Sequence, residues 1–514
     1  MAGIRDVLIV GGGTAGWLTA AYLARALGTE SGHGIRITLV ESSDIGILGV
    51  GEGTFPSIKG TLSTIGIPEA RFLRGANATF KQGVRFQNWV RPKGTAGADS
   101  YFHPFNLPSY RGDRLELLPY WLMGAAGPGV GFAEAATMQT RVAASARGPK
   151  RLTDGDYQGP MNYAYHFDAV KFAALLGEEA RRLKVDHIVA TVGRVDLDQD
   201  GAIAAVVTKD GRTLTADLYV DCSGFRGALI GDALGSPYRS VNDILFADRA
   251  VAIQAPYERP DTPIASYTIS TAHEAGWTWD IGLPERRGVG YVYSTRYTDD
   301  ARAEEVLRAY IGPRSDALSA RVLKFNVGYR EIQWSKNCVA VGLSAGFLEP
   351  LESSGIGLIE TAAYLIAHLF PFDGKFEPVA KLFNELMTAR FSRIVDFLKM
   401  HYCLTQRTDS PFWVDNAHPR SIPDSLKERL EMWRCRPPHR LDFVTDLEMY
   451  LPSSWQFVLY GMEFATDLNG SATCYPRIDA ARREFQMIRQ VSEHAVKDLP
   501  DHRELVAHLD AQAA

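Results

Sequence analysis

The sequence predicts an α/β fold that combines a sheet-and-helix unit at the N-terminus with a layered β-sheet region and a mainly helical C-terminal region. Three observations support this prediction. A buried-strand pattern at residues 6–10 runs directly into a glycine-rich turn and a helical pattern. Asp-Gly pairs at residues 200–201 and 210–211 separate short apolar runs, as in β-hairpins. From about Pro378 onward, apolar residues recur with helical spacing.

Composition limits the classes of protein to consider. The 514 residues suffice for two or three domains or one large one, and 46% of them are hydrophobic. The formal net charge of -5 argues against a general nucleic-acid or membrane-surface binder.

The N-terminus lacks a signal-peptide pattern, and no run of about 18 apolar residues could span a bilayer. The five cysteines show no CxxC pair and no zinc spacing, so we expect a cytoplasmic protein with reduced thiols and no metal site.

The N-terminal segment reads as strand, glycine-rich turn, helix, strand and acidic residue. Gly11, Gly13 and Gly16 match GxGxxG between the first strand and the helix. The first glycine permits the turn, the second lets a pyrophosphate approach the backbone, and the third lets helix and strand pack closely. Glu41, at the end of the second strand, is placed to accept hydrogen bonds from ribose hydroxyls. The segment predicts a Rossmann-like dinucleotide site, with candidates Gly11, Gly13, Thr14, Ala15, Gly16 and Glu41.

Two elements follow near the centre of the chain. Residues 168–183 read as a helix with Asp168 as its N-cap. Residues 194–197, 202–207 and 213–221 are joined by the two Asp-Gly turns. We expect these strands to form a meander layered against the nucleotide-binding sheet.

The glycine-rich turn alone does not distinguish FAD from NAD, but two later segments do so by resemblance. Residues 220–224 (VDCSG) resemble the second FAD fingerprint of single-component aromatic hydroxylases. Residues 340–346 resemble the third, which adds Gly342 and Leu343 as candidates, although many relatives have Asp at the latter position. The implied fold is an FAD-binding Rossmann-like domain of the aromatic-hydroxylase (PHBH-like) type. Because no second GxGxxG is present for a nicotinamide, a separate flavin reductase is the expected source of reduced flavin.

Three further segments carry a resemblance to one family. Residues 277–284 (WTWDIGLP) resemble its WxWxIP motif, with Gly282 in place of proline. Residues 80–86 (FKQGVRF) resemble its lysine segment. Residues 347–356 (FLEPLESSGI) match its most specific run, with Ser354 in place of threonine. The chain thus resembles the flavin-dependent tryptophan halogenase family, from the first strand to about residue 415.

The resemblance assigns roles to the matched residues of the halide and lysine sites. Lys81 matches the catalytic lysine, and Glu352 matches the carboxylate partnered with it. The backbone amides of Ser354 and Gly355 match the halide site. Consecutive N–H groups in a small-residue turn make a suitable anion nest.

Substrate-side roles follow from the same resemblance. His103 and Phe105, within the YFHPF segment, match residues that flank the indole ring. Trp277 and Trp279 match the bulky rings that separate the flavin from the substrate. A substrate ring behind them does not reach the flavin directly, so hydroxylation is suppressed.

The implied reaction uses reduced FAD (FADH2), O2 and a halide, either bromide or chloride, to form hypohalous acid. Lys81 then guides the halogen to an aromatic carbon, so that proximity selects the ring position. The lysine either hydrogen-bonds the hypohalous acid or forms a haloamine, and the sequence leaves both open. Glu352 is expected to hold the lysine charge and to remove the ring proton. Bromide is easier to oxidise than chloride, so we expect bromination to be at least as fast.

One C-terminal segment bears on the substrate. Tryptophan 7-halogenases carry Glu-x-x-x-Phe-Trp shortly before a glycine, and counting back from Gly461 places this pattern on residues 445–450 (TDLEMY). Thr445 then occupies the position of the acid that binds the amino group, and Met449 and Tyr450 occupy the ring-stacking positions. A zwitterion loses affinity without its charged partner. We therefore expect a neutral indole or another electron-rich arene rather than free tryptophan.

The expected organisation is a discontinuous FAD-binding module at residues 1–375 that also bears the halide and lysine sites. Substrate-side sheet insertions are expected at about 80–165 and 240–330 within it. A helical substrate-side region is expected at residues 376–514.

Several alternatives stay open. A tryptophan halogenase proper would accept the free amino acid. An FAD-dependent aromatic monooxygenase would insert oxygen instead, and Lys81 and the Trp277/Trp279 pair weigh against it. A non-catalytic flavin-binding module is the third reading. Apart from the reductase and a small aromatic substrate we expect no nucleic-acid or membrane partner, and a homodimer is left open.

Overall fold

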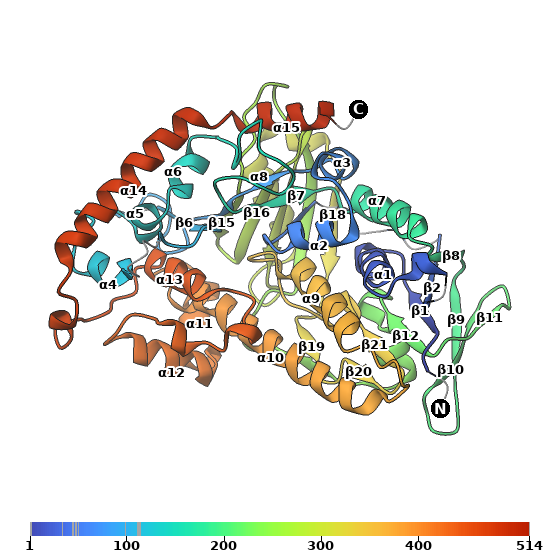
Figure 1. The fold of residues 1–514 in the computed structure, drawn as a ribbon. Helices are drawn as coiled ribbons and strands as arrows, with labels where there is room; N and C mark the ends of the chain where they lie inside the picture. Colours follow the sequence, from blue (N-terminus) through green and yellow to red (C-terminus); the bar gives the residue numbers. More distant parts are fainter. Residues whose placement is uncertain are drawn as a thin grey trace. The chain divides into compact units, whose positions relative to one another are not determined.

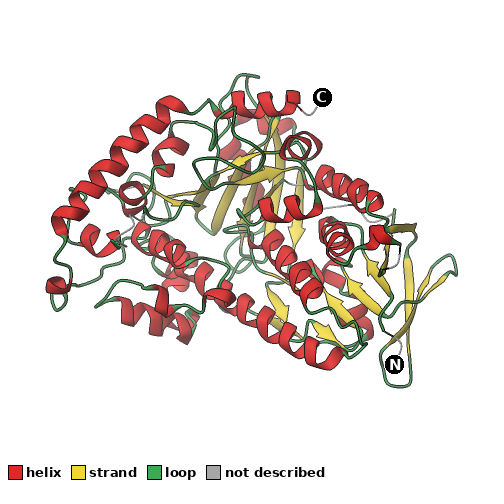
Figure 2. Cartoon of the chain, viewed as in Figure 1, coloured by secondary structure: helices red, strands yellow, loops and turns green. Residues whose placement is uncertain are grey.

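The computed structural model describes residues 3–32, 34–43, 46, 49, 51–97, 99–109 and 115–512. The chain forms two compact units, each built from three separate segments (Figure 1). The first unit comprises Met1–Ala78, Phe167–Val241 and Phe325–Ser392, and the second comprises Thr79–His166, Asn242–Lys324 and Arg393–Ala514. Both units contain helices and strands (Figure 2).

A six-stranded sheet with the order β20-β21-β12-β1-β2-β8 organises the first unit. The pairs from β21 to β8 are all parallel. Because the carboxyl ends of parallel strands meet at one edge, the turns after β1, β2, β12 and β21 lie together there. The strands are β1 (Asp6–Val10), β2 (Arg36–Glu41), β8 (Asp186–Val189), β12 (Leu218–Asp221), β20 (Trp334–Ser335) and β21 (Cys338–Ala340).

Both faces of this sheet are covered, as the continuous apolar runs of its strands predict. On one face, Gly16 of α1 (Thr14–Ala26) approaches Leu39. On the other face, Val10 packs in one cluster with Val206 of the meander. The meander consists of β9 (Val192–Leu197), β10 (Ile203–Thr208) and β11 (Thr213–Leu214). The predicted layered meander is therefore confirmed, with the correction that residues 213–221 split, because β12 joins the six-stranded sheet.

Helix α1 packs against both α7 (Ala169–Arg182) and α9 (Ser354–His368) in the first unit (Figure 1). Asp168 caps α7 as predicted, since its carboxylate accepts hydrogen bonds from the amides of Val170 and Lys171. The other elements of this unit are β3 (Glu52–Gly53), α2 (Ile58–Ile65), α3 (Glu69–Gly75), β13 (Tyr238–Ser240), β19 (Gly328–Arg330), β22 (Gly346–Phe347) and the first part of α10 (Phe376–Cys403).

A seven-stranded sheet with the order β18-β14-β17-β16-β15-β5-β6 organises the second unit. Its strands are β5 (Gly83–Gln87), β6 (Ser100–Pro104), β14 (Arg249–Pro256), β15 (Thr268–His273), β16 (Gly276–Gly282), β17 (Arg286–Tyr293) and β18 (Ala320–Lys324). Helix α8 (Asp300–Ile311) covers one face, where Ala303 and Leu307 pack against Val251, Val289 and Tyr291. The opposite face is therefore available to the site.

The remaining elements of the second unit are mostly helical, and the helices after residue 393 agree with the prediction of a mainly helical C-terminal region. The remaining elements are β4 (Thr79–Lys81), α4 (Leu117–Leu122), α5 (Phe132–Ala136), α6 (Gln139–Ala144), β7 (Ala164–Phe167), α11 (Pro411–Ala417), α12 (Asp424–Trp433), α13 (Pro452–Gly461), α14 (Ile478–Asp498) and α15 (His502–Gln512). Helices α4, α5 and α6, in contrast, lie within residues 80–165, where sheet insertions were expected. Among the described residues, no helix combines the length and apolar character needed to cross a bilayer.

Candidate active site

The glycine-rich turn after β1 has the shape that a pyrophosphate requires. A Cβ on Gly11 would lie 2.2 Å from the carbonyl oxygen of Cys222, and φ at this glycine is +119°. A Cβ on Gly16 would lie 1.8 Å from the carbonyl oxygen of Gly11. A Cβ on Gly13, in contrast, would meet nothing within 4 Å. Gly11 and Gly16 thus permit close packing, and Gly13 leaves open space at the N-terminus of α1, where backbone N–H groups attract phosphate.

The carboxylate of Glu41 lies beside this turn. A Cβ on Gly12 would lie 1.6 Å from Oε2 of Glu41, so no side chain fits between them. Nε2 of His187 lies 2.8 Å from Oε1 of Glu41. His187 stands on β8, next to β2. The acid is therefore held at the carboxyl edge of the sheet, where the ribose of a dinucleotide is bound in such folds.

The two later fingerprints reach the same edge. Asp221 is fully buried, and its carboxylate accepts hydrogen bonds from the amides of Ser223, Leu229 and Ile230 at 2.8–2.9 Å. It shapes the turn after β12 and is occupied by the protein itself. Gly342 has a φ of +74°, and a Cβ there would lie 2.7 Å from Cβ of Ala15. The next residue, Leu343, is half-buried. The first unit thus fits FAD, with the three fingerprints brought together.

The start of α9 carries the predicted halide residues. Glu352 and Ser353 both have left-handed backbone conformations, with φ of +64° and +57°. Two consecutive residues of this kind without glycine store strain, which is common at functional sites. Ser354 is buried, whereas a Cβ on Gly355 would meet nothing within 4 Å. Gly355 therefore borders open space at the N-terminus of α9, where backbone N–H groups favour an anion.

Lys81 lies in the second unit, and its side chain is fully buried, with 0% exposed. It ends β4, which pairs antiparallel with β7. Its Nζ lies 5.4 Å from the ring centroid of Phe105, within cation–π range. The pKa of His166, on β7, is lowered well below its ordinary value by burial and next by the charge of Lys81. Burial of an ammonium group is costly, so Lys81 is no ordinary surface lysine.

The predicted tryptophans and histidine share one face of the seven-stranded sheet. Across neighbouring strands, Trp279 of β16 lies opposite Ser270 of β15, Ser270 lies opposite Phe86 of β5, and Phe86 lies opposite Tyr101 of β6. Paired residues point to the same face, and His103 is two positions from Tyr101. Trp277, two positions before Trp279, therefore also lies on this face. It is the face opposite α8, since Trp279 pairs with Gly290 and not with the residues that α8 covers.

Aromatic side chains from the C-terminal helices surround His103. Its ring centroid lies 6.0 Å from that of Phe397 and 6.5 Å from that of Phe457. Tyr450 is buried and stacks on Phe397 with a centroid separation of 3.8 Å. Tyr450 was predicted from the sequence for the substrate side, whereas Phe397 and Phe457 were not. Their helical spacing was the available signal, and it does not separate a site residue from a core residue.

Residues 445–450, at the position of the Glu-x-x-x-Phe-Trp pattern, contain a carboxylate that is already paired. Thr445 is exposed, so it replaces the expected acid with a surface hydroxyl. The side chain of Glu448 is 1% exposed, and its Oε1 lies 2.9 Å from Nε of Arg393. Arg429 lies 3.6 Å from the same oxygen. Glu448 is therefore committed to two guanidinium groups.

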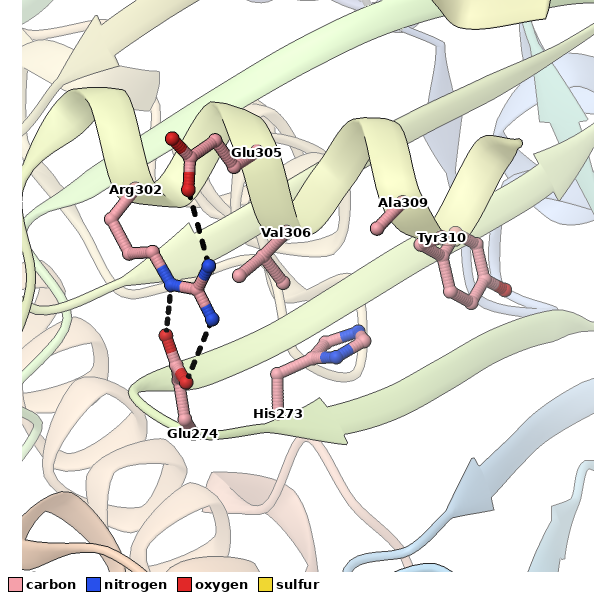
Figure 3. A pocket seen from close by; sticks show the side chains of 7 residues that line it. All are labelled: His273, Glu274, Arg302, Glu305, Val306, Ala309 and Tyr310. Carbon is pink, nitrogen blue, oxygen red and sulfur yellow. Dashed lines mark hydrogen bonds and ion pairs between the residues drawn. The ribbon is translucent and has the colours of Figure 1, made fainter. Parts of the chain in front are cut away.

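A separate pocket of about 360 Å³ lies in the second unit between the β15–β16 hairpin and α8 (Figure 3). Arg302 donates to both Glu274 and Glu305 across its rim. Burial lowers the pKa of His273 to about 4, so this imidazole is neutral at neutral pH. The pocket contains none of the predicted site residues, and its charges pair with one another. We assign it no part in the reaction.

The predicted site residues divide between the two units. The first unit holds the residues predicted for the cofactor and the halide together with Glu352, namely Gly11, Gly13, Thr14, Ala15, Gly16, Glu41, Gly342, Leu343, Glu352, Ser354 and Gly355. The second unit holds Lys81 and the substrate-side residues His103, Phe105, Trp277, Trp279 and Tyr450.

Comparison with known proteins agrees with these features. The tryptophan halogenase family profile matches residues 6–473. Tryptophan 6-halogenase SttH of Streptomyces toxytricini is 36% identical, and the alignment covers 98% of this chain and 97% of that protein. The crystal structure of a tryptophan halogenase from Shewanella frigidimarina superposes with a TM-score of 0.94 at 41% identity, covering 99% of this chain and 98% of that chain. BrvH, a flavin-dependent halogenase from Brevundimonas, gives a TM-score of 0.88 at 34% identity, with 98% and 99% covered.

The aromatic-hydroxylase-like flavin fold, the buried lysine and these similarities over nearly the whole chain agree on one assignment. The chain belongs to the tryptophan halogenase family and is a flavin-dependent halogenase.

Proposed function

We propose that this halogenase acts on a small neutral indole or a related electron-rich arene, with a flavin reductase as the source of FADH2. The observation that carries the substrate choice is the pairing of Glu448 with Arg393 and Arg429. A substrate ammonium group would have to compete with two guanidinium groups for this carboxylate. Thr445 offers no charge in its place. A neutral ring needs no such partner and avoids the cost of leaving a buried charge unpaired.

For the halide, we propose that the amides of Ser354 and Gly355 hold bromide or chloride at the N-terminus of α9. The open space at Gly355 and the helix dipole support this site. The larger bromide is also the easier halide to oxidise. We therefore propose that bromination is at least as fast as chlorination.

For the cofactor, we propose that the turn around Gly13 receives the FAD pyrophosphate and that Glu41 receives the ribose, with Thr14, Ala15, Gly342 and Leu343 completing the site. When bound, reduced FAD supplies, with O2 and one proton, the two-electron oxidation of halide to hypohalous acid, and water is the second product. The chain itself fixes where the halide stands during this step.

For halogen transfer, we propose that Lys81 holds hypohalous acid, by a hydrogen bond or as a haloamine, next to the ring carbon that attacks the halogen. The ring carbon gains the halogen and loses its proton, and the hypohalous oxygen leaves as water. Glu352 is proposed to balance the lysine charge and to accept the ring proton. The burial of Lys81 excludes water, so the oxidant is not lost to solvent.

On the substrate side, we propose that His103, Phe105 and Tyr450 flank the ring. Trp277 and Trp279 stand as the barrier on the same sheet face as His103. A large aromatic barrier admits a small oxidant and excludes a substrate ring from the flavin.

The test is a paired assay. The full chain is incubated with FAD, a flavin reductase, NADH and bromide or chloride, with indole or tryptophan as substrate. We expect kcat/KM for indole to exceed that for tryptophan by about tenfold or more. Lys81→Ala should abolish halogenated indole, whereas Lys427→Ala, at a lysine of the same unit whose side chain is 42% exposed, should not. A preference for tryptophan would contradict the substrate proposal, and guided halogenation by Lys81→Ala would contradict the role of the lysine.

A further inference from the structure

The strand that carries Lys81 is held from outside by the C-terminal helix. Strand β4 has only three residues, so it offers few ladder hydrogen bonds of its own. The amide of Phe80, directly before the lysine, donates to Nε2 of His502 at 3.1 Å. His502 is the first residue of α15 and is fully buried. The main chain at the lysine is therefore fixed by a residue 422 positions away.

The imidazole of His502 can make this contact in one tautomer only. Its Nδ1 lies 2.9 Å from the carbonyl oxygen of Ile264. A carbonyl oxygen accepts and does not donate, so Nδ1 carries the proton and Nε2 is left as the acceptor. Burial lowers the pKa of His502 to about 4, which keeps the ring neutral at neutral pH. The ring thus bridges Phe80 and Ile264 in a defined orientation.

The segment around His502 is itself firmly anchored. The amide of His502 donates to the carbonyl oxygen of Ala146 at 2.9 Å, and the amide of Gly148 donates to the carbonyl oxygen of Pro500 at 3.0 Å. Between these residues, the carbonyl of Arg147 accepts from the side chain of Gln82 at 2.8 Å. The residues on both sides of Lys81 are therefore tied to the same small region at the start of α15.

We propose that His502 is a positioning residue for halogen transfer: its neutral imidazole fixes the main chain at Phe80 and thereby aims Lys81 at the substrate ring. This inference rests on the proposed role of Lys81 as the residue that guides the oxidant. His502 contacts the strand and not the reacting atoms. Its loss therefore acts on delivery of the oxidant and leaves its formation intact.

Two substitutions separate the two hydrogen bonds of the ring. Glutamine places its amide oxygen near the position of Nε2, so His502→Gln keeps an acceptor for the Phe80 amide. Asparagine places its amide near Nδ1, so His502→Asn keeps a donor for Ile264 but leaves the Phe80 amide without an acceptor. His508→Asn, on the same helix, is the matched control for effects on α15 as a whole.

The experiment measures guided and unguided oxidant in the full chain. Each variant is incubated with FAD, a flavin reductase, NADH, bromide and indole, and brominated indole is quantified. A parallel reaction replaces indole with a 1,3-diketone that traps diffusing hypobromous acid. The ratio of brominated indole to trapped bromine reports delivery. Thermal unfolding of each variant is recorded beside it.

We expect His502→Asn to lower this ratio by about tenfold, with the trapped amount near that of the unsubstituted chain, and His502→Gln to restore most of it. An unchanged ratio in His502→Asn overturns the inference. So does a parallel loss of both products in His502→Asn and His502→Gln, because that result describes a structural role alone. Lys81→Ala is run alongside: if it still brominates indole at the same ratio, the role of the lysine fails first, independently of His502.

Discussion

Nε2 of His187 lies 2.8 Å from Oε1 of Glu41, so the acid that ends β2 directly contacts a residue on the next strand of the sheet. The contact leaves the other carboxylate oxygen of Glu41 facing the glycine-rich turn. An oriented carboxylate loses less freedom when it accepts hydrogen bonds from a ribose.

The first prediction concerns this carboxylate. Glu41→Ala should weaken FAD binding by about 10- to 100-fold, because hydrogen bonds to a charged acceptor contribute roughly 1.5–3 kcal/mol. Quenching of flavin fluorescence on titration with the protein measures the affinity. Glu178→Ala removes an exposed glutamate of the same unit and should leave the affinity unchanged. Equal affinities for Glu41→Ala and the unsubstituted chain would exclude the ribose role.

The second prediction separates folding from binding within the glycine-rich turn. Gly13→Ala places a methyl group in open space, so the chain should keep its melting temperature but lose affinity for FAD. Gly16→Ala places its methyl group 1.8 Å from a backbone oxygen, so helix and strand must move apart and the chain should be destabilised by several kcal/mol. Thermal unfolding without FAD, followed by flavin titration, distinguishes the two effects. If Gly13→Ala binds FAD normally, the pyrophosphate lies elsewhere.

The third prediction concerns the aromatic stack beside His103. Phe397→Ala removes the ring on which Tyr450 stacks, and KM for indole should rise about tenfold, because stacking and apolar burial are both lost. Bromide oxidation without indole, measured with the diketone trap, should change little. Leu441→Ala, at a residue that is 78% exposed, serves as the control. A loss of bromide oxidation together with indole turnover would argue for general unfolding.

The fourth prediction is a pH dependence of stability. Glu360 of α9 is buried, accepts hydrogen bonds from Thr61 at 2.5 Å and Ser57 at 3.0 Å, and has its pKa raised by burial to about 7. The folded state therefore binds more protons than the unfolded state between about pH 4.5 and 7, and the free energy of unfolding falls as pH rises through this window. Glu360→Gln does not titrate. The free energy of unfolding of this variant, relative to that of the unsubstituted chain, should therefore gain roughly 2–3 kcal/mol between pH 5 and pH 8.

Urea unfolding at pH 5 and pH 8 measures this difference. Glu377→Gln, an exposed residue of the same unit, should show no such gain. If the free energies of unfolding of Glu360→Gln and the unsubstituted chain differ by the same amount at both pH values, Glu360 does not titrate in this range.

Local elements could be predicted from the sequence because their signals are local. The strand–turn–helix–strand order around Gly11 and Gly16 depends on residues that are neighbours along the chain. The N-cap at Asp168 depends on amides two and three residues away. The matched segments around Lys81 and Glu352 carried the family resemblance, and the comparisons confirmed the family.

The surroundings of the lysine could not be predicted in this way. Lys81 alone reads as an exposed charge, but it is fully buried. The amides of its neighbours Phe80 and Gln82 donate to His502 and Ser266, which are far away in the sequence. Residues 213–221 read as one strand because their apolar pattern is continuous. Only the parallel pairing of β12 with β1 splits them, and that pairing is non-local.

The dependence of Phe80 on His502 also has a consequence for how the enzyme is made in the cell. The ribosome synthesises the strand of Lys81 early. His502, which accepts the hydrogen bond from this strand, follows only at position 502 of 514. A nascent chain that has not reached His502 therefore lacks this hydrogen bond to Phe80. A truncated translation product that ends before His502 would lack the contact as well, so we expect it to hold the strand of Lys81 less firmly.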